Sequence, residues 1–267
     1  SVGGQMLPGT KIGYIRISVF NEQTGADFAK KYIELEKEGM QALLLDLRHN
    51  PGGILGECVK VAQYIVPKGT VVSIKDRSGN TFVEESNLEK IKYPLAVLVD
   101  HGSASAAEIV AGAVQDTGAG KLFGVQTFGK GSVQSVYKLS ENTGLKLTTA
   151  KYYTPSGRSI HGTGIKPDVE VELDLQSMKD TQLEAAENYL KEQLAKAGVT
   201  DADYLIYKQG GIDKFTFDKD GKPVGVDDIL KPLREDKTYS HLFAEKGGAY
   251  TPKGGSGSSD VNPWAKE

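Results

Sequence analysis

The sequence predicts an α/β fold, in which helices flank a mixed sheet and a polar C-terminal extension follows. Apolar residues alternate along the chain between the period of strands and the period of helices. Two apolar runs, residues 42–48 and 95–100, are typical of strands that are covered on both faces. The 267 residues, 39% hydrophobic and 25% charged, suffice for one large or two modest domains.

The individual elements follow from local pattern. Residues 11–20 alternate as a half-buried strand, and residues 26–39 carry apolar side chains at helical spacing. The strand at 42–48 leads through the turn HNPGG into a helix at 54–65, and the strand at 95–100 leads into a helix at 104–116. Residues 132–139 and 144–154 alternate around the turn-rich ENTG, which predicts a hairpin.

The composition changes near residue 178, so we expect a core over residues 1–177 and a separate part over 178–267. The second part begins with a helix whose apolar face is formed by Leu183, Ala186, Leu190, Leu194 and Ala197 and which ends at Gly198. Polar, turn-rich sequence follows, and residues 246–267 have the Gly/Ser/Pro composition of a flexible linker or tail.

Charge and cysteine content exclude several classes of function. The net charge of −3 provides no basic field for nucleic acid or anionic lipid, and no apolar run reaches the roughly 18 residues of a membrane span. Cys58 is the single cysteine, so no intrachain disulfide forms, and its apolar neighbours predict a buried thiol. No His/Cys/Glu grouping has metal-ligand spacing, so we expect neither metal nor cofactor.

The segment GVQTFGKGSVQ, residues 124–134, nearly completes a phosphate-binding loop through Gly124, Gly129 and Lys130. Such a loop needs Ser or Thr after the lysine and a helix beyond it. Here Gly131 follows Lys130, and the next residues alternate as a strand. The sequence therefore argues against a nucleotide site and leaves Lys130 either as a solvated charge or as a group with another role.

Two further segments place a serine hydroxyl and glycine backbone amides at the carboxyl ends of predicted strands. Ser105 begins a helix, where backbone N–H groups favour developing negative charge, although Ser105 to Glu108 is also a capping-box pattern. Gly52 and Gly53 in the turn HNPGG expose bare amides above the edge of the sheet, although a plain turn explains them equally.

Taken together, DLRHNPGG, GSASAAEI and TFGKGSVQ resemble the carboxy-terminal processing, or tail-specific, proteases, a family of Ser-Lys endopeptidases. The resemblance runs from about Met6 to Val171. It implies a crotonase/ClpP-like core with Ser105 as nucleophile and Lys130 as base, the latter supported by Gln134. It also implies an oxyanion hole formed by the amide of Gly52 or Gly53 together with that of Ala106.

The implied chemistry constrains these residues physically. A lysine can take the serine proton only when it is neutral, so its surroundings must lower the ordinary pKa of about 10.4. In a fully extended strand the Cα atoms of Lys130 and Gln134 would lie about 13 Å apart, so contact between them requires a bend or a lysine side chain that lies along the chain.

The resemblance also carries expectations about substrates and context. It implies protein or peptide substrates with apolar C-termini, an extracytoplasmic location in bacteria and a possible homo-oligomer. Family members usually carry a PDZ module before the region where this chain begins, and we expect none within this sequence. The residues after 200 resemble, less closely, a phage minor structural or scaffolding protein. A fused tail, a family-specific extension, and a non-enzymatic assembly protein with a vestigial core therefore remain alternatives.

A histidine triad is the competing mechanism. His49, His101 and His161 lie near the motifs, and Asp46, Asp100 or Asp116 could orient one of them. The serines occur in HGSASAA, so no G-x-S-x-G elbow is present, and we expect His101 to be a turn residue.

Overall fold

The computed structural model describes residues 1–141, 143–174, 176 and 179–196, with the short segments 216–217 and 223–224 and residues 231 and 235. The predicted linker at 246–267, Ala197 and most of the polar extension lie outside these residues. No helix within the described ranges is long and apolar enough to cross a bilayer.

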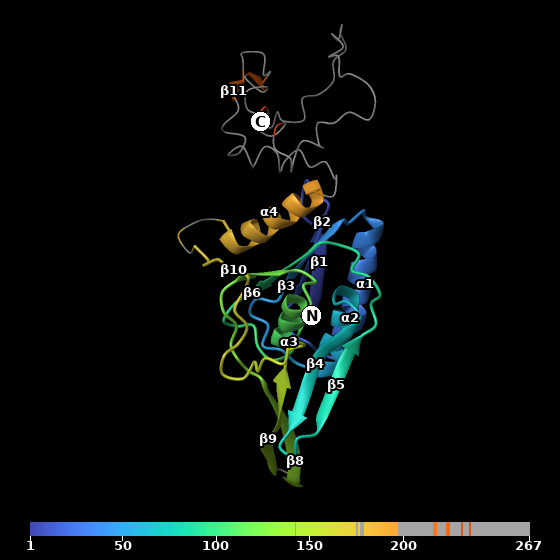
Figure 1. Ribbon diagram of the computed structural model, residues 1–267, viewed down its shortest axis with the longest axis vertical. Coiled ribbons are helices and arrows are strands. Elements are labelled where there is room, and N and C mark those ends of the chain that lie inside the picture. Colours follow the sequence, from blue (N-terminus) through green and yellow to red (C-terminus); the bar gives the residue numbers. More distant parts are fainter. Residues whose placement is uncertain are drawn as a thin grey trace.

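A six-stranded sheet forms the centre of the molecule (Figure 1). The first strand is antiparallel to the second and all other neighbours are parallel, so the predicted mixed sheet and α/β fold are confirmed. In spatial order the strands are β1 (Val2–Met6), β2 (Ile12–Ile17), β3 (Ala42–Asp46), β6 (Leu95–Val99), β7 (Lys121–Gly124) and β10 (Val169–Glu170).

Helices cover both faces of this sheet. Because side chains alternate along a strand, Leu43 and Leu45 of β3 face one layer and Leu44 faces the other. The first layer contains α1 (Thr24–Lys37), α2 (Leu55–Ile65) and α3 (Ala106–Asp116), and the second contains α4 (Thr181–Lys196). The strand is therefore buried on both sides, as its apolar run predicts.

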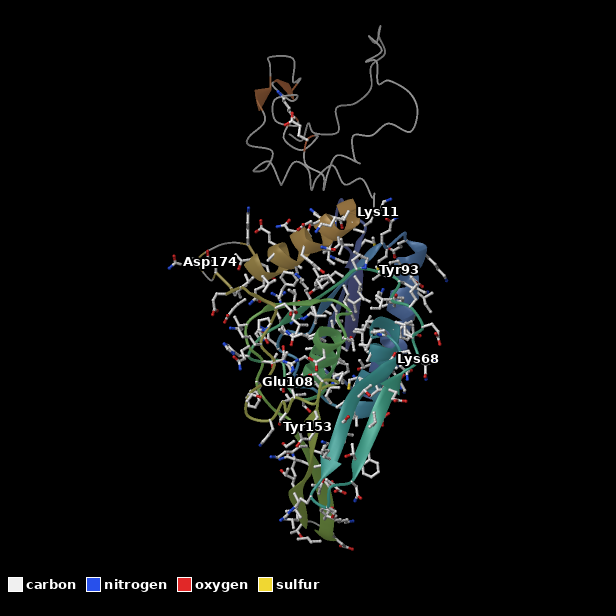
Figure 2. All side chains as sticks on the ribbon, viewed as in Figure 1. Lys11, Lys68, Tyr93, Glu108, Tyr153 and Asp174 are labelled. Carbon is white, nitrogen blue, oxygen red and sulfur yellow. The ribbon has the colours of Figure 1, made fainter. Side chains whose placement is uncertain are left out.

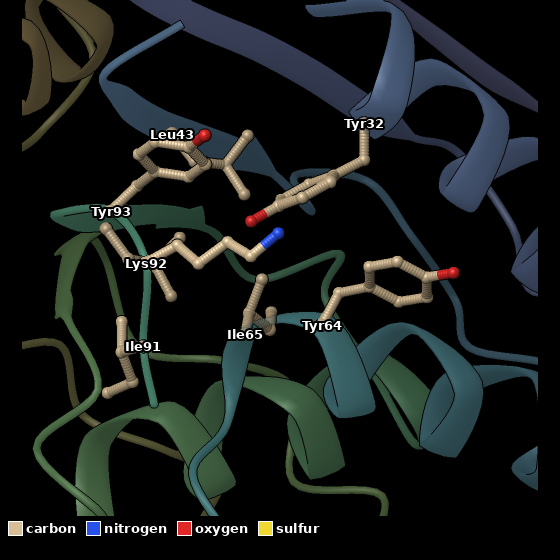
Figure 3. A pocket seen from close by; sticks show the side chains of 8 residues that line it. Tyr32, Leu43, Tyr64, Ile65, Ile91, Lys92 and Tyr93 are labelled. Atoms are coloured by element: carbon tan, nitrogen blue, oxygen red, sulfur yellow. The ribbon is translucent and has the colours of Figure 1, made fainter. Parts of the chain in front are cut away.

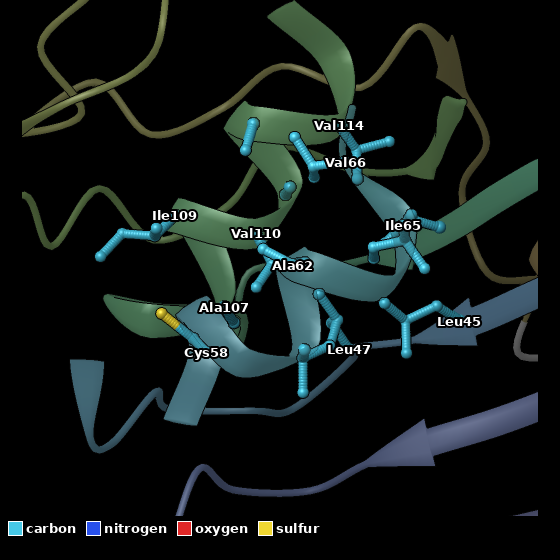
Figure 4. Packing of buried hydrophobic residues seen from close by; sticks show 14 of the residues in the cluster. Leu45, Leu47, Cys58, Ala62, Ile65, Val66, Ala107, Ile109, Val110 and Val114 are labelled. Atoms are coloured by element: carbon cyan, nitrogen blue, oxygen red, sulfur yellow. The ribbon is translucent and has the colours of Figure 1, made fainter. Parts of the chain in front are cut away.

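The contact between α2 and α3 forms the centre of the larger core (Figure 4). Small side chains such as Ala62 and Ala107 let the two helices approach, and Val110 fills the space beside them. Cys58 lies in this cluster with no exposed surface, and burial raises the pKa of its thiol. The predicted buried thiol is confirmed, and such a thiol is not a nucleophile.

A second, antiparallel sheet extends away from the core (Figure 1). It includes the predicted hairpin, which is confirmed to within one residue at each strand end. In spatial order the strands are β5 (Thr81–Ser86), β4 (Gly69–Asp76), β9 (Thr143–Tyr153) and β8 (Ser132–Ser140). A further pair, β11 (Thr216–Phe217) and β12 (Pro223–Val224), is antiparallel.

A small cavity lies between α1, α2 and the segment before β6 (Figure 3). Tyr32, Tyr64 and Tyr93 surround it with aliphatic side chains, and its volume is about 10 Å³. A space of this size holds at most about one water molecule. The cavity is thus a feature of core packing and not a ligand site.

Candidate active site

Ser105 lies between β6 and α3, at the carboxyl edge of the parallel strands. Its backbone has φ 54° and ψ −114°, a left-handed conformation that is costly for a residue with a side chain. The neighbouring Ser103 is fully buried, and its hydroxyl donates to the carbonyl of Leu47 at 2.8 Å. Ser103 therefore stabilises the turn, whereas Ser105 is half-buried in a strained conformation.

The glycine turn after β3 packs directly against Ser105. A Cβ on Gly52 would lie 2.7 Å from the Cβ of Ser105 and 2.9 Å from the backbone nitrogen of Ala106, so only glycine fits there. Asn50 fixes the turn, because its amide nitrogen donates to the carbonyl of Ile17 and its oxygen accepts from the Gly52 N–H, both at 2.8 Å. Two segments about 50 residues apart thus meet at the serine.

The two glycines differ in the use of their amides. The Gly52 N–H is occupied by Asn50, whereas the Gly53 and Ala106 N–H groups have no acceptor within the described residues. Ala106 is the first residue of α3, where an N–H lacks an intrahelical partner. Gly53 is held with φ +139° against Phe20, whose carbonyl oxygen would lie 2.0 Å from an added Cβ.

Glu108, which is labelled in Figure 2, joins the serine to the loop that carries Lys130 through hydrogen bonds. Its side chain is fully buried. Its carboxylate accepts from the N–H of Ser105 at 2.9 Å, the hydroxyl of Thr127 at 2.5 Å and the N–H groups of Gly129 and Lys130 at 2.7 and 2.8 Å. The bond to Ser105 is the Glu108 half of the predicted capping box, but the other three bonds reach beyond the helix.

Lys130 and Gln134 lie on one continuous unit, the loop after β7 and the first part of β8. Lys130 is half-buried, and its amine has no ion-pair or hydrogen-bond partner in the part of the chain described. Gln134 is exposed and lies at a shift of register between β8 and β9, and no hydrogen bond joins it to Lys130. The roles of both residues stay predictions.

The strand that follows Lys130 excludes the context of a phosphate loop. β8 begins at Ser132, so Lys130 precedes a strand and the loop opens no helix of its own. The sequence-based argument against a nucleotide site is confirmed in this respect. In the described residues no group of three His, Cys, Asp or Glu side chains could hold a metal ion.

One histidine does pair with a carboxylate. The Nδ1 of His49 lies 3.0 Å from Oδ2 of Asp100, but the His49 side chain is 75% exposed and donates to no serine within the described residues. Asp46 pairs with Arg48 and Asp116 with Arg158. His101 lies in the turn after β6, as expected. The histidine alternative therefore has an Asp–His pair without the serine contact that a triad requires.

Four residues that contribute to the site were not identified as site residues from the sequence. Asn50 and Glu108 act through contacts that only the fold brings about, although the capping-box pattern did contain Glu108. Ile54 and Phe128 are exposed apolar side chains beside the site, at 44% and 68%. Ile54 follows Gly53, and the N–H of Phe128 donates to the carbonyl of Ser103 at 3.0 Å.

The fold and site define an α/β protein with a serine at the start of a helix, beside unpaired backbone amides, which is how serine hydrolases present a nucleophile. The sequence profile of Peptidase family S41 matches residues 11–171, and the chain belongs to this family. A second profile, Phage capsid assembly scaffolding protein, matches residues 170–263.

Curated relatives have consistent names. The chain is 41% identical over 186 residues to a carboxyl-terminal-processing protease of Synechocystis sp., covering 67% of this chain and 44% of the relative. It is 43% identical over 171 residues to a carboxy-terminal-processing protease of Bartonella bacilliformis, covering 61% and 39%. The chain therefore spans less than half the length of these relatives.

Solved structures agree with this assignment. The photosystem II D1 C-terminal processing protease is 38% identical with a TM-score of 0.58, over 67% of this chain and 46% of that one. A putative S41 protease from Bacteroides fragilis is 20% identical with a TM-score of 0.59, over 75% and 58% of the two chains, which shows a common fold alone.

Proposed function

We propose that the chain is the core of a serine endopeptidase in which Ser105 is the nucleophile and Lys130 the general base. The observation that carries the proposal is the Glu108 carboxylate, which binds the backbone of both residues at once. Ser105 and Lys130 are 25 positions apart in the sequence, and a link of this kind is what a nucleophile and its base need in order to keep their relative position.

The proposed reaction proceeds in two steps. The Ser105 oxygen attacks the carbonyl carbon of the scissile bond while its proton passes to the neutral Lys130 amine, which then gives the proton to the leaving amine. Water hydrolyses the resulting ester and regenerates the serine. We assign the oxyanion hole to the Gly53 and Ala106 amides, because the Gly52 N–H is already bonded; each donor contributes about 3 to 4 kcal/mol.

Apolar substrate residues suit the surroundings of Ser105. Ile54 and Phe128 are large, exposed apolar side chains on the two segments that flank the serine. The similar proteins are named as carboxyl-terminal processing proteases. We therefore propose cleavage of unfolded or partly unfolded polypeptides near apolar C-termini by an extracytoplasmic, homo-oligomeric bacterial protein, with Gln134 supporting Lys130.

Mass spectrometry of an unfolded protein with an apolar free C-terminus tests the proposal. We expect fragments with the wild type and none with Ser105→Ala, Lys130→Ala or Lys130→Arg, because arginine does not give up its proton. His49→Ala serves as the matched control and should retain cleavage. Activity that survives in Lys130→Ala and disappears in His49→Ala would instead support the Asp100–His49 pair.

A second candidate function is a non-enzymatic, phage-type scaffold or assembly role with a vestigial core. The profile match over residues 170–263 favours this candidate. Sedimentation of the wild type and Ser105→Ala with and without residues 197–267 separates the two functions. Assembly that depends on residues 197–267, without cleavage by any variant, would support the scaffold role alone.

A further inference from the structure

The open edge of the second sheet leads away from the proposed active site. Given the proposed peptidase function, we infer that an extended substrate segment binds along the outer edge of β8 as an added strand, with apolar side chains on the hairpin face. The inference assigns the surface that holds the substrate main chain and the kind of segment that it accepts.

β8 is the last strand in the order β5-β4-β9-β8. Its residues from Ser132 to Ser140 pair with β9, and no described residue pairs with its other edge. Such an edge presents a row of unpaired N–H and C=O groups, which natural proteins usually shorten or cover. Peptides in extended conformation bind exposed edges of this kind through main-chain hydrogen bonds.

The edge begins at the proposed base. Ser132 follows Lys130 by two positions, and the loop before it is bonded to Ser103 through Phe128 and to Glu108. At Gly131 the chain is already covered, because an added Cβ would lie 2.3 Å from the backbone nitrogen of His161. A substrate segment bound along the open part of β8 therefore runs outward from the site. Seven substrate residues in extended conformation would span about 20 Å.

Apolar side chains follow the same path. Tyr137 lies opposite Leu145, and Ser135 lies opposite Leu147, so Tyr137, Leu145 and Leu147 share one face of the hairpin. These three side chains are 49%, 43% and 45% exposed. Ile54 and Phe128, on the two segments that flank Ser105, are exposed apolar side chains as well.

Charge favours a substrate over a second copy of the chain. Lys138, Lys146 and Lys151 are exposed on the hairpin, and Glu141 is its acidic residue. Two copies joined edge to edge would place two lysine-rich hairpins side by side, with Lys138 on each joined strand, which is unfavourable. A polypeptide with alternating apolar residues and a free terminal carboxylate complements both the charge and the apolar face.

Binding in the Ser105→Ala background tests the inference without cleavage. The probe is a fluorescein-labelled, unstructured twelve-residue peptide with apolar residues at every second position and a free carboxyl terminus. We expect Tyr137→Lys to weaken its binding at least tenfold in fluorescence anisotropy. Phe82→Lys is the matched control, because Phe82 is an aromatic residue, 62% exposed, on the opposite edge strand β5, and its dissociation constant should not change.

N-methylated peptides test the main-chain contact directly. Methyl groups on one alternate set of backbone nitrogens should abolish binding and those on the other set should not, because an added strand presents every second N–H to β8. Equal effects of both sets, or equal binding by the Tyr137→Lys and Phe82→Lys variants, would overturn the inference even if the wild type cleaves protein. Self-association that Tyr137→Lys abolishes would assign the edge to a second copy and overturn it as well.

If the peptide binds as expected but the wild type cleaves no protein, the proposed peptidase function fails while the binding surface stands.

Discussion

At the scale of single residues, Glu108 is the group on which the geometry of the site depends. All four of its hydrogen-bond partners are donors, so a carboxylate satisfies the arrangement and a protonated carboxyl does not. It touches neither substrate nor reacting atoms in the proposed mechanism. It is therefore a positioning residue, which holds the Ser105 and Lys130 backbones in one relative placement.

Glu108→Gln should lower kcat by about 100-fold with little change in KM, because the amide turns two hydrogens toward donors and displaces the lysine loop. Steady-state kinetics on a fluorogenic peptide measures this split. The matched control is Glu57→Gln, since Glu57 is also buried on a helix and accepts the Gly25 N–H, far from Ser105 in the sequence. An equal loss of kcat in both variants would mean that Glu108 supports the fold in general and does not specifically position Ser105 and Lys130.

The sequence identified the residue types at the site but not how they are held. Ser105, Lys130 and the glycine pair stand out through local motifs, and the mutual contacts of Gly52 and Ser105 then follow from the fold. The positive φ of Ser105 and the bond from Gly52 to Asn50 arise from tertiary contacts. No local pattern encodes such contacts, so the choice of Gly53 over Gly52 as the proposed oxyanion donor required the structure.

At the scale of elements, the buried strands and the helices were the most predictable. Continuous apolar runs predicted β3 and β6. Helical spacing predicted α1, α2 and α3, and the predicted ends of these helices lie within two residues of the observed ones. The strands β1 and β5 gave no clear signal, because β1 contains two glycines and most of β5 is exposed. Their pairing partners stabilise them, which a single segment does not reveal.

A charged contact joins the residue before α4 to the end of β3. Arg48, after β3, binds both Asp46 and Asp180 at 2.7 and 2.8 Å. Partial burial acts to raise the pKa of Asp180, but hydrogen bonds from Arg48 and from the Leu183 N–H outweigh it and lower the pKa. The carboxylate is therefore the form that the folded state favours.

A pKa lowered by folding contributes stability that is present above the unfolded value of about 3.9 and is lost as the pH falls through the lower folded value. We expect the melting temperature of the wild type to fall more steeply below about pH 4 than that of Asp180→Asn, which has no carboxylate to protonate. Calorimetry between about pH 2 and about pH 6 measures the melting temperature of both proteins as a function of pH. Parallel curves would mean that the Arg48 contact does not stabilise the docked helix.

At the scale of the whole molecule, the packed core includes α4, which lies beyond the boundary at residue 177 that composition predicts. Ala186, Leu190 and Leu194 of α4 are almost fully buried against Leu44, Leu98 and Phe123 of the sheet. The helix therefore covers the second face of the same sheet whose edge carries Ser105. We propose that the unit required for folding ends near Lys196 and that a separate part of the chain begins after it.

Two truncations separate these boundaries. Removal of residues 197–267 should leave the melting temperature and peptide cleavage unchanged within error, because the core contacts of α4 remain. Removal of everything after Asp180 also deletes α4 and uncovers an apolar sheet face, at a cost of about 5 kcal/mol for its buried leucines and alanine. That cost is comparable to the whole stability of a domain, roughly 5 to 15 kcal/mol, so this shorter chain should aggregate or unfold. Circular dichroism melting and gel filtration compare the two chains. A shorter chain that folds and cleaves as well as the longer one would place the boundary at about residue 177, as composition indicates, and would make α4 a part of the extension.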